Sequence, residues 1–233
     1  MAQPDTRDPD ETARTRLAYV QIAPEHAQAL EELERISFPT TDPVELTSAA
    51  TILMQCDMFP EGGFVVLDGE RIVGFAMGIF VDFDLDDFQH HIDDAVGPTG
   101  AEYHDPNGEW YYGTDIVVHP DYRGRGIGRA LYDLRKDLVR RHNRAGIIAG
   151  GVIPGFARHK HEMSADEYVE KVAAGELFDP TLSFQIANGF EVRGAIAGYM
   201  RDPAVDDYAS FIVWHNPDHD PDALERERAS AER

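Results

Sequence analysis

The feature that most constrains this chain is a glycine-rich turn that joins a strand-like segment to a helix-like segment in mid-sequence. The strand-like run covers residues 109–118 (EWYYGTDIVV), the turn reads RGRGIG at residues 123–128, and an amphipathic pattern follows to about His142. At such a junction the first amides of the helix have no carbonyl partner within the helix, and the helix dipole favours an anion there. Glycines let an anion approach the backbone, so the turn predicts a phosphate-binding site.

The order of residues in this turn differs from that of two common phosphate-binding loops. A Rossmann loop carries G-x-G-x-x-G after an early strand, with an acidic residue about 20 positions later, whereas this turn reads R-x-x-G-x-G in mid-chain. A P-loop ends in Gly-Lys-Ser/Thr, which is absent here. The pattern favours a diphosphate carried by another cofactor, and a nucleotide-binding enzyme that uses ATP or NAD stays open as the weaker alternative.

The R-x-x-G-x-G turn, preceded by a strand that ends in Val-His-Pro and followed by Ala-Leu-Tyr, resembles the acyl-coenzyme-A-binding motif of the GNAT acetyltransferase superfamily. The later segment SFQIANGFE (residues 183–191) is similar to the last helix of that family and the Gly-Phe that follows it. The resemblance covers residues 17–215. Three further segments are similar to acetyltransferase domains found beside nitrilase-like hydrolase domains: residues 150–155, 168–171 and 179–199. Because the sequence ends at Arg233, we expect no hydrolase domain to follow.

The resemblance implies an α/β fold in which a twisted, mixed sheet of about six or seven strands is flanked by helices. It also implies that the sheet splays between the fourth and fifth strands, where the pantetheine arm enters, with residues 115–118 and 147–151 beside the split. The segment pattern agrees with a mixed layer, because strands and helices alternate irregularly and a hairpin signal occurs early, at Asp68-Gly69.

Periodicity and capping signals predict the elements and the domain limits. Asp42 followed by Pro43 predicts the start of a helix that ends between Met54 and Met58. Strands are expected at residues 17–22, 63–67, 71–83, 109–118, 147–153, 190–200 and 210–214, and other helices at 24–36, 126–142, 164–174 and 181–188. We expect a single domain at 17–215, with an acidic insertion at 84–108 and a helical insertion at 155–176, between a disordered tail at 1–16 and a charged tail at 216–233.

On this resemblance, acetyl-coenzyme A is the expected acyl donor, and its parts need different partners. The backbones of Ile116, Val117 and Val118 could pair with the pantetheine amides as if a strand were added. An amide near Ile116 would stabilise the oxyanion of the tetrahedral intermediate. The residues expected to bind the pyrophosphate are Arg123, Gly124, Arg125, Gly126, Ile127, Gly128 and Arg129.

The acceptor amine must lose a proton before it attacks the thioester, so a base is expected close to the fourth strand. Asp115, Glu109 and His104 are the candidates. In many relatives a tyrosine four residues before the Gly of Gly-Phe protonates the departing thiolate, but that position here is Gln185, which is not an acid near pH 7. Either the thiolate leaves unassisted or another tyrosine serves, the options being Tyr112, Tyr132 and Tyr199.

Composition excludes several other classes of function. The 43 acidic residues against 21 Lys and Arg give a formal charge of −22, which disfavours nucleic acid as a partner and suggests adaptation to high salt. Cys56 is the single cysteine, and the histidines at 90–91 and 159–161 fit no zinc spacing, so no metal is expected. Without an apolar run of membrane length or a signal-peptide core, a cytoplasmic protein is expected.

The sequence therefore predicts an N-acetyltransferase that moves an acetyl group from acetyl-coenzyme A to a primary amine of a small molecule or protein, by direct attack in a ternary complex. A non-catalytic acyl-coenzyme-A sensor is the alternative, because Gln185 replaces the usual acid and no base is obvious. The identity of the amine, the length of the acyl group and the oligomeric state, including the homodimer common among relatives, stay open.

Overall fold

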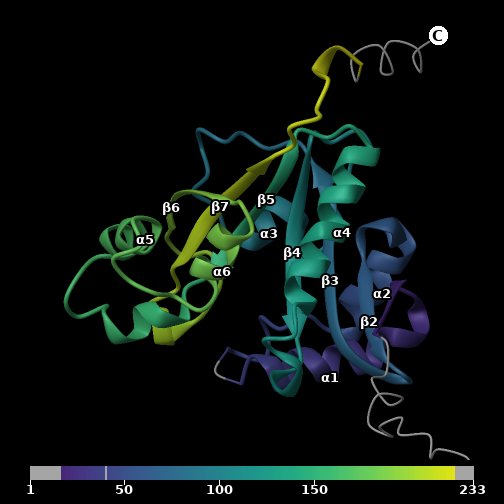
Figure 1. The fold of residues 1–233 in the computed structure, drawn as a ribbon, viewed down its shortest axis with the longest axis horizontal. Coiled ribbons are helices and arrows are strands. Elements are labelled where there is room, and N and C mark those ends of the chain that lie inside the picture. Colours follow the sequence, from purple (N-terminus) through teal and green to yellow (C-terminus); the bar gives the residue numbers. More distant parts are fainter. Residues whose placement is uncertain (1–16, 40, 224–233) are drawn as a thin grey trace, which may run out of the picture.

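The protein is described by a computed structural model that covers residues 17–39 and 41–223. Within these residues seven strands form one mixed sheet, and helices pack on both of its faces (Figure 1). The strands are β1 (Ala18–Gln21), β2 (Phe64–Asp68), β3 (Arg71–Val81), β4 (Trp110–Val118), β5 (Gly146–Val152), β6 (Glu191–Ile196) and β7 (Ala209–His215). The α-helices are α1 (Ala27–Ser37), α2 (Ala49–Met58), α3 (Ile92–Val96), α4 (Ile127–Arg141), α5 (Ala165–Ala173) and α6 (Leu182–Ala187).

The sheet has the order β1-β2-β3-β4-β5-β7-β6, which confirms the predicted mixed α/β fold. The β2–β3 hairpin turns at Gly69, whose φ of 63° suits glycine. The strand β6 ends at Ile196, earlier than predicted, because the chain turns at Gly198 with a φ of 65°. The tail predicted at residues 1–16 and most of the tail predicted at 216–233 lie outside the described residues.

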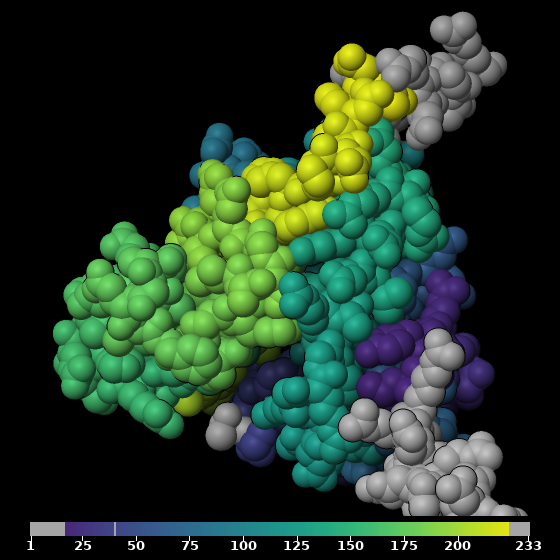
Figure 2. Space-filling model, in the orientation of Figure 1, coloured from purple at the N-terminus to yellow at the C-terminus, as the bar shows by residue number. Residues whose placement is uncertain are grey.

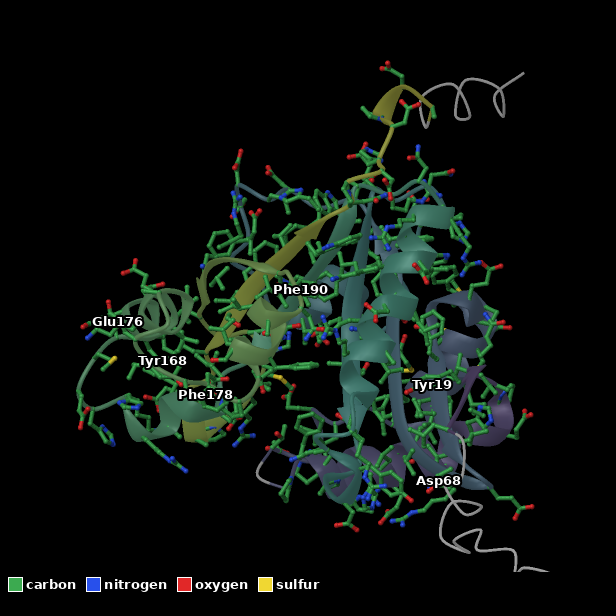
Figure 3. All side chains as sticks on the ribbon, in the orientation of Figure 1. Tyr19, Asp68, Tyr168, Glu176, Phe178 and Phe190 are labelled. Carbon is green, nitrogen blue, oxygen red and sulfur yellow. The ribbon has the colours of Figure 1, made fainter. Side chains whose placement is uncertain are left out.

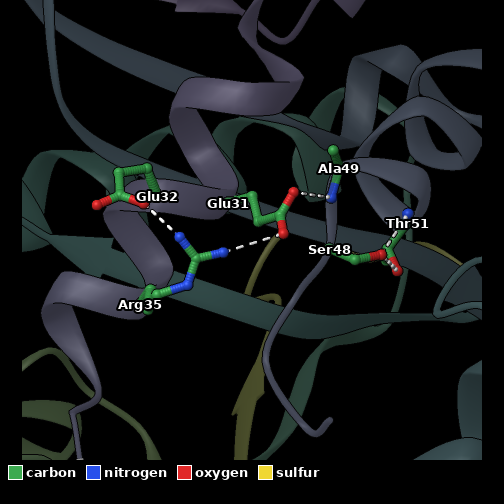
Figure 4. Close-up of polar contacts among 6 residues, drawn as sticks. All are labelled: Glu31, Glu32, Arg35, Ser48, Ala49 and Thr51. Atoms are coloured by element: carbon green, nitrogen blue, oxygen red, sulfur yellow. Dashed lines mark hydrogen bonds and ion pairs between the residues drawn. The ribbon is translucent and has the colours of Figure 1, made fainter. Parts of the chain in front are cut away.

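The helix predicted to begin at Asp42 begins later, and that prediction is wrong. The Asp42 carboxylate accepts a hydrogen bond from the amide two residues on, which closes a turn. The helix α2 instead has Ser48 as its N-cap, whose Oγ accepts from the Thr51 amide at 3.2 Å (Figure 4). The Glu31 carboxylate of α1 accepts from the Ala49 amide at 3.1 Å, so α1 also caps α2.

The two faces of the sheet are covered by different helices. The helices α1 and α2 pack Leu30 and Ile52 against Phe75 of β3. On the opposite face, α4 packs Ile127 and Leu131 against β2 and β3. The helices α5 and α6 lie on the α4 face at the β5–β7 end of the sheet. Tyr168, Glu176 and Phe178 lie in the lobe around α5, on the other side of the molecule from Tyr19 and Asp68, while Phe190 lies near the centre (Figure 3).

The sheet is split between its fourth and fifth strands. The parallel strands β4 and β5 pair only where residues 110–112 meet residues 146–148, and their carboxyl-terminal halves diverge. This confirms the predicted splay and shows that it begins beyond Tyr112 and Ile148. Close to this point β4 also bulges, because Thr114 has no partner in the register with β3. In the space-filling view the green segment that carries α5 and α6 stands beside the teal α4 (Figure 2).

Candidate active site

The glycine-rich turn forms the start of α4, as the sequence predicted. Gly124 and Gly126 have φ of 76° and 83°, and Gly126 is the N-cap of the helix. The first amide of this region with an intrahelical acceptor is that of Ala130, which donates to the Gly126 carbonyl at 3.0 Å. The amides of residues 125–129 donate to no acceptor in the part of the chain that the structure describes. These free donors lie at the positive end of the α4 dipole, where an anion is stabilised.

Two arginines of the turn contact protein groups and brace the loop. The Arg123 guanidinium donates to the carbonyls of Ser37 and Val118, each at 3.2 Å. The Arg125 guanidinium stacks over the Tyr122 ring at 4.5 Å. The two guanidinium charges therefore lie beside the turn, and some of their N–H donors already bind groups of the protein. Among the other predicted binding residues of the turn, Arg129 is exposed and Ile127 is buried under β2 and β3.

The open edge of β4 faces the split. The His119 amide, next after β4, donates to the Val73 carbonyl of β3 at 2.9 Å. Because successive residues of a strand direct their backbone groups to opposite sides, Ile116 and Val118 direct theirs away from β3, toward the split. Beyond Tyr112 no pairing with β5 occupies this edge. The backbone groups of Ile116 and Val118 thus face the split and those of Val117 face β3, while the Val118 carbonyl also accepts from Arg123. The pairing of residues 116–118 with the pantetheine stays a prediction.

A cavity of about 350 Å³ opens at the split. Its lining comes from the end of α1, the segment that leads into α2, the start of α3, the diverging halves of β4 and β5, and the helices α4 and α6. The predicted residues Asp115, Ile116 and Val117 line it, whereas Val118 and the residues of the turn lie outside it. The helix α4 links the two regions, because it begins at the turn and places Tyr132 and Arg135 in the cavity wall.

Two carboxyl groups approach the cavity from different elements. The Asp115 carboxylate accepts a hydrogen bond from the Thr47 hydroxyl at 2.6 Å. Burial raises the pKa of Asp115, although the Thr47 bond and the Arg135 charge act in the other direction. Burial, and then the Asp115 charge, raise the pKa of Glu34 from 4.5 to about 9. One oxygen of Glu34 has no hydrogen-bond partner among the described residues, so near pH 7 Glu34 places a neutral carboxyl with a free acceptor beside Asp115.

Arg135 is a fully buried cation beside these carboxyls. Its guanidinium reaches from α4 to the bulge between β3 and β4 and donates to the carbonyls of Met77 and Asp115. Gly113 makes this possible, because a Cβ there would lie 2.9 Å from the Arg135 Nη1. Arg135 therefore joins β3, β4 and α4 at the point where the strands diverge.

Comparison with known proteins decides the family. A sequence profile of the Acetyltransferase (GNAT) family matches residues 27–152. The chain belongs to this family. The chain is 32% identical over 190 residues to the uncharacterized N-acetyltransferase YkwB of Bacillus subtilis. This match covers 81% of the chain and 84% of YkwB. It is also 35% identical over 201 residues to the probable hydrolase YhcX of the same organism, covering 86% of this chain but only 39% of YhcX.

Solved structures with this GNAT fold have low sequence identity to the chain and bear on the fold alone. The loading GNATL domain of CurA from Lyngbya majuscula matches with a TM-score of 0.73 at 16% identity, over 86% of this chain and 98% of that domain. The GphF GNAT-like decarboxylase, in complex with isobutyryl-CoA, matches with a TM-score of 0.69 at 21% identity, over 86% and 99% of the two chains. As a member of the GNAT family, the chain is an acyltransferase.

In this GNAT chain the helix α6 brings Gln185 to the cavity. Gln185 is buried, and its Oε1 has no partner among the described residues. Tyr132 of α4 lines the same cavity, and burial raises its pKa. Of the tyrosines that were considered, Tyr132 and Tyr199 line the cavity and Tyr112 lies directly behind Tyr199, with 3.0 Å between the hydroxyl oxygens.

The structure does not bring Glu109 or His104 to the cavity. Glu109 is exposed, immediately before the end of β4 that is paired with β5. The His104 ring stacks on Phe59 at 4.3 Å, and its Nδ1 accepts from the Phe80 amide. These two candidates were chosen because they are close to β4 in the sequence. They lie at its amino-terminal end, whereas the cavity is at its carboxyl-terminal half.

Sequence analysis missed three polar residues of the site: Glu34, Thr47 and Arg135. A signal existed for two of them. Glu34 lies in the helical stripe of Leu30 and Leu33, and Arg135 follows Leu131 by four residues, so each places a charge on an apolar helix face. No comparable local signal marks Thr47, which meets its partner 68 residues away.

No group of three or more His, Cys, Asp or Glu side chains is placed to hold a metal ion within residues 17–39 and 41–223. In the same residues, the helices are too short or too polar to cross a membrane.

Proposed function

We propose that the chain transfers an acetyl group from acetyl-coenzyme A to the primary amine of a small cationic acceptor, by direct attack in a ternary complex. The row of free amides at residues 125–129 carries this proposal, because it lies on the same helix that lines the carboxyl-bearing cavity. The match over most of both chains to YkwB, an uncharacterized N-acetyltransferase, supports the same activity.

In this proposal each part of the donor meets a matching group. The pyrophosphate binds the amides of the turn, with Arg123, Arg125 and Arg129 nearby, and the pantetheine pairs with the free edge of β4. The thioester then lies at the split, close to the β4 bulge at Thr114, where a backbone amide can stabilise the oxyanion. Gly128 lets α6 approach α4, because a Cβ there would lie 2.9 Å from the Phe184 ring.

The acceptor amine binds as an ammonium between the carboxyls of Asp115 and Glu34. Thr47 holds the Asp115 carboxylate in place, and the unpartnered oxygen of Glu34 can accept from the ammonium. After the ammonium loses a proton, the free amine attacks the thioester carbonyl and coenzyme A departs as its thiolate, which a second proton converts to the thiol. Tyr132 donates its hydroxyl proton to the thiolate, in place of the absent tyrosine at position 185, and regains a proton from the nitrogen as the amide forms.

Binding of the donor is tested by calorimetry with acetyl-coenzyme A, ATP and NAD. We expect acetyl-coenzyme A to bind in preference to the others. Gly126→Glu should weaken its affinity at least about 100-fold, because a carboxylate would occupy the anion site. Gly175→Glu is the matched control, since Gly175 also has a positive φ (76°) and open space around it but lies at the end of α5. Preference for ATP or NAD, or equal affinity in both variants, would contradict the proposal.

Turnover is tested by thiol release from acetyl-coenzyme A with a panel of amines that includes 1,4-diaminobutane. We expect Asp115→Asn to raise the KM for the amine, with Asp86→Asn in the exposed part of the insertion as the control. Tight binding of acetyl-coenzyme A without thiol release from any amine would favour a non-catalytic sensor, which the presence of Gln185 keeps as the second candidate function.

A further inference from the structure

Two buried tyrosines and a half-buried histidine connect the cavity to a second hollow in the protein. Tyr199 lines the cavity, with its ring tip against Gly150 of β5. The Tyr199 and Tyr112 hydroxyl oxygens are 3.0 Å apart, and the Tyr112 hydroxyl lies 2.8 Å from Nε2 of His90. His90 itself lines the second hollow, together with Asp82, Phe83, Asp94 and Asp105. We propose that Tyr199, Tyr112 and His90 form a proton relay, which carries the proton released by the acceptor amine from the cavity to this hollow.

The direction of the relay follows from the groups at its outer end. Nδ1 of His90 lies 2.8 Å from the Phe88 carbonyl. A carbonyl can only accept, so Nδ1 carries the proton in the neutral ring and Nε2 accepts from the Tyr112 hydroxyl. The Tyr112 oxygen then accepts from the Tyr199 hydroxyl. The Tyr199 oxygen also accepts from the Gly150 amide, and its second lone pair can take a proton that comes from the cavity.

The surroundings of Tyr112 and Tyr199 favour a proton transfer in which neither phenol becomes a stable phenolate. Burial raises the pKa of Tyr112 and of Tyr199, and the Asp115 charge raises the pKa of Tyr199 further. Each phenol therefore gives up its proton only as it receives another. Asp115 also faces the same cavity as Tyr199, which places the ammonium that we propose beside the first member of the relay.

The outer end of the relay can take up a proton and release it to water. Burial lowers the pKa of His90, so its ring is neutral near pH 7 and can accept the incoming proton. Around it, the Asp94 charge favours the imidazolium and the His91 charge opposes it. Asp82 and Asp105 line the same hollow and add negative charge at the exit.

The relay rests on the proposed acyl transfer, because that reaction releases one proton that must leave the cavity. The acceptor ammonium carries three protons on nitrogen, and the amide product retains one. One proton ends on the coenzyme A thiol, so one must leave the cavity. It passes to the Tyr199 oxygen as the Tyr199 proton moves to Tyr112 and the Tyr112 proton moves to Nε2 of His90. The imidazolium then turns away from Tyr112 and releases the Nε2 proton to water in the second hollow, which restores the ring protonated at Nδ1.

The kinetic test uses thiol release from acetyl-coenzyme A with 1,4-diaminobutane. His90→Gln keeps an acceptor for Tyr112 but cannot take a proton, so we expect kcat to fall by about 100-fold with the KM for acetyl-coenzyme A unchanged. Tyr112→Phe should have the same effect. The unaltered protein should lose activity as the pH falls through the lowered pKa of His90, and His90→Gln should lack this acidic limb. His161→Gln, on an exposed loop, is the control.

An unchanged kcat in His90→Gln, or a lower kcat with the acidic limb intact, would overturn the relay while leaving acyl transfer in place. If the unaltered protein releases no thiol, the proposed function fails for this amine, and the relay is then judged by nitrogen NMR. The signals of His90, assigned by their loss in His90→Gln, should show protonation at Nδ1 near pH 8. His26, whose Nδ1 accepts from the Ala23 amide at 3.1 Å, should show the opposite tautomer. Protonation at Nε2 of His90 would overturn the relay whatever the kinetics.

Discussion

The buried Glu34 carboxyl makes the stability of the fold depend on pH in a way that one substitution reveals. Its pKa is about 9 in the folded chain against an ordinary value of 4.5. Between these values the folded chain binds one proton more than the unfolded chain, so the free energy of unfolding falls as the pH rises. The slope for one proton is about 1.4 kcal/mol per pH unit. Glu34→Gln keeps the shape of the protonated acid and removes this titration.

We therefore expect Glu34→Gln to become more stable than the unaltered protein as the pH rises. Between pH 5 and pH 7 the difference in unfolding free energy should grow by about 3 kcal/mol. Urea unfolding followed by circular dichroism at several pH values measures it, and Glu32→Gln on the exposed side of α1 is the control. If the difference in unfolding free energy between the two proteins stays constant from pH 5 to pH 8, Glu34 is ionised in the folded chain. That result would refute the raised pKa of Glu34.

Three further predictions concern packing, capping and salt. Gly150→Ala should lower the unfolding free energy by about 1–3 kcal/mol in urea unfolding, because the new Cβ would lie 2.2 Å from the Tyr199 ring. Asp179→Ala should lower it by about 3 kcal/mol or more, because the amides of Gly155 and Leu182 and the hydroxyl of Tyr168 lose their acceptor; a change below about 1 kcal/mol would contradict this assignment. The melting temperature should rise with KCl, because salt screens a formal charge of −22; equal melting temperatures with and without molar KCl would contradict salt adaptation.

The sequence predicted those parts of the molecule whose signals are local. The turn at residues 123–128 combines glycines with a strand before and a helix after, and the hairpin at Gly69 has a two-residue turn, so both were found. The start of α2 was misplaced because Asp42 and Ser48 are both good N-caps, and Asp42 forms a turn instead. Both residues have the N-cap preference, so this preference alone does not show where the helix begins. The packing of α1 against α2 determines that α2 begins after Ser48.

The groups that give the cavity its chemistry were harder to predict, because they come together over long sequence separations. Thr47 meets Asp115 at 68 residues, and Tyr112 meets Tyr199 at 87. His90 was considered only as a metal ligand and fits no zinc spacing, and nothing near it in the sequence suggests the tyrosine that it contacts. Such partners become visible only when the register of β4 and the path of the insertion are known.

At the split of the sheet, groups from opposite faces act on one residue, Asp115. Glu34 approaches from the α1 face and Arg135 from the α4 face, which a continuous sheet would keep apart. Where β4 leaves β5 and bulges at Thr114, the Arg135 guanidinium reaches the carbonyl of Asp115, while the Asp115 charge raises the pKa of Glu34. The opening at the split thus also brings the Asp115 carboxylate, the Glu34 carboxyl and the Arg135 guanidinium into one cavity. A change that closed the split would remove both the opening and this arrangement of groups at once.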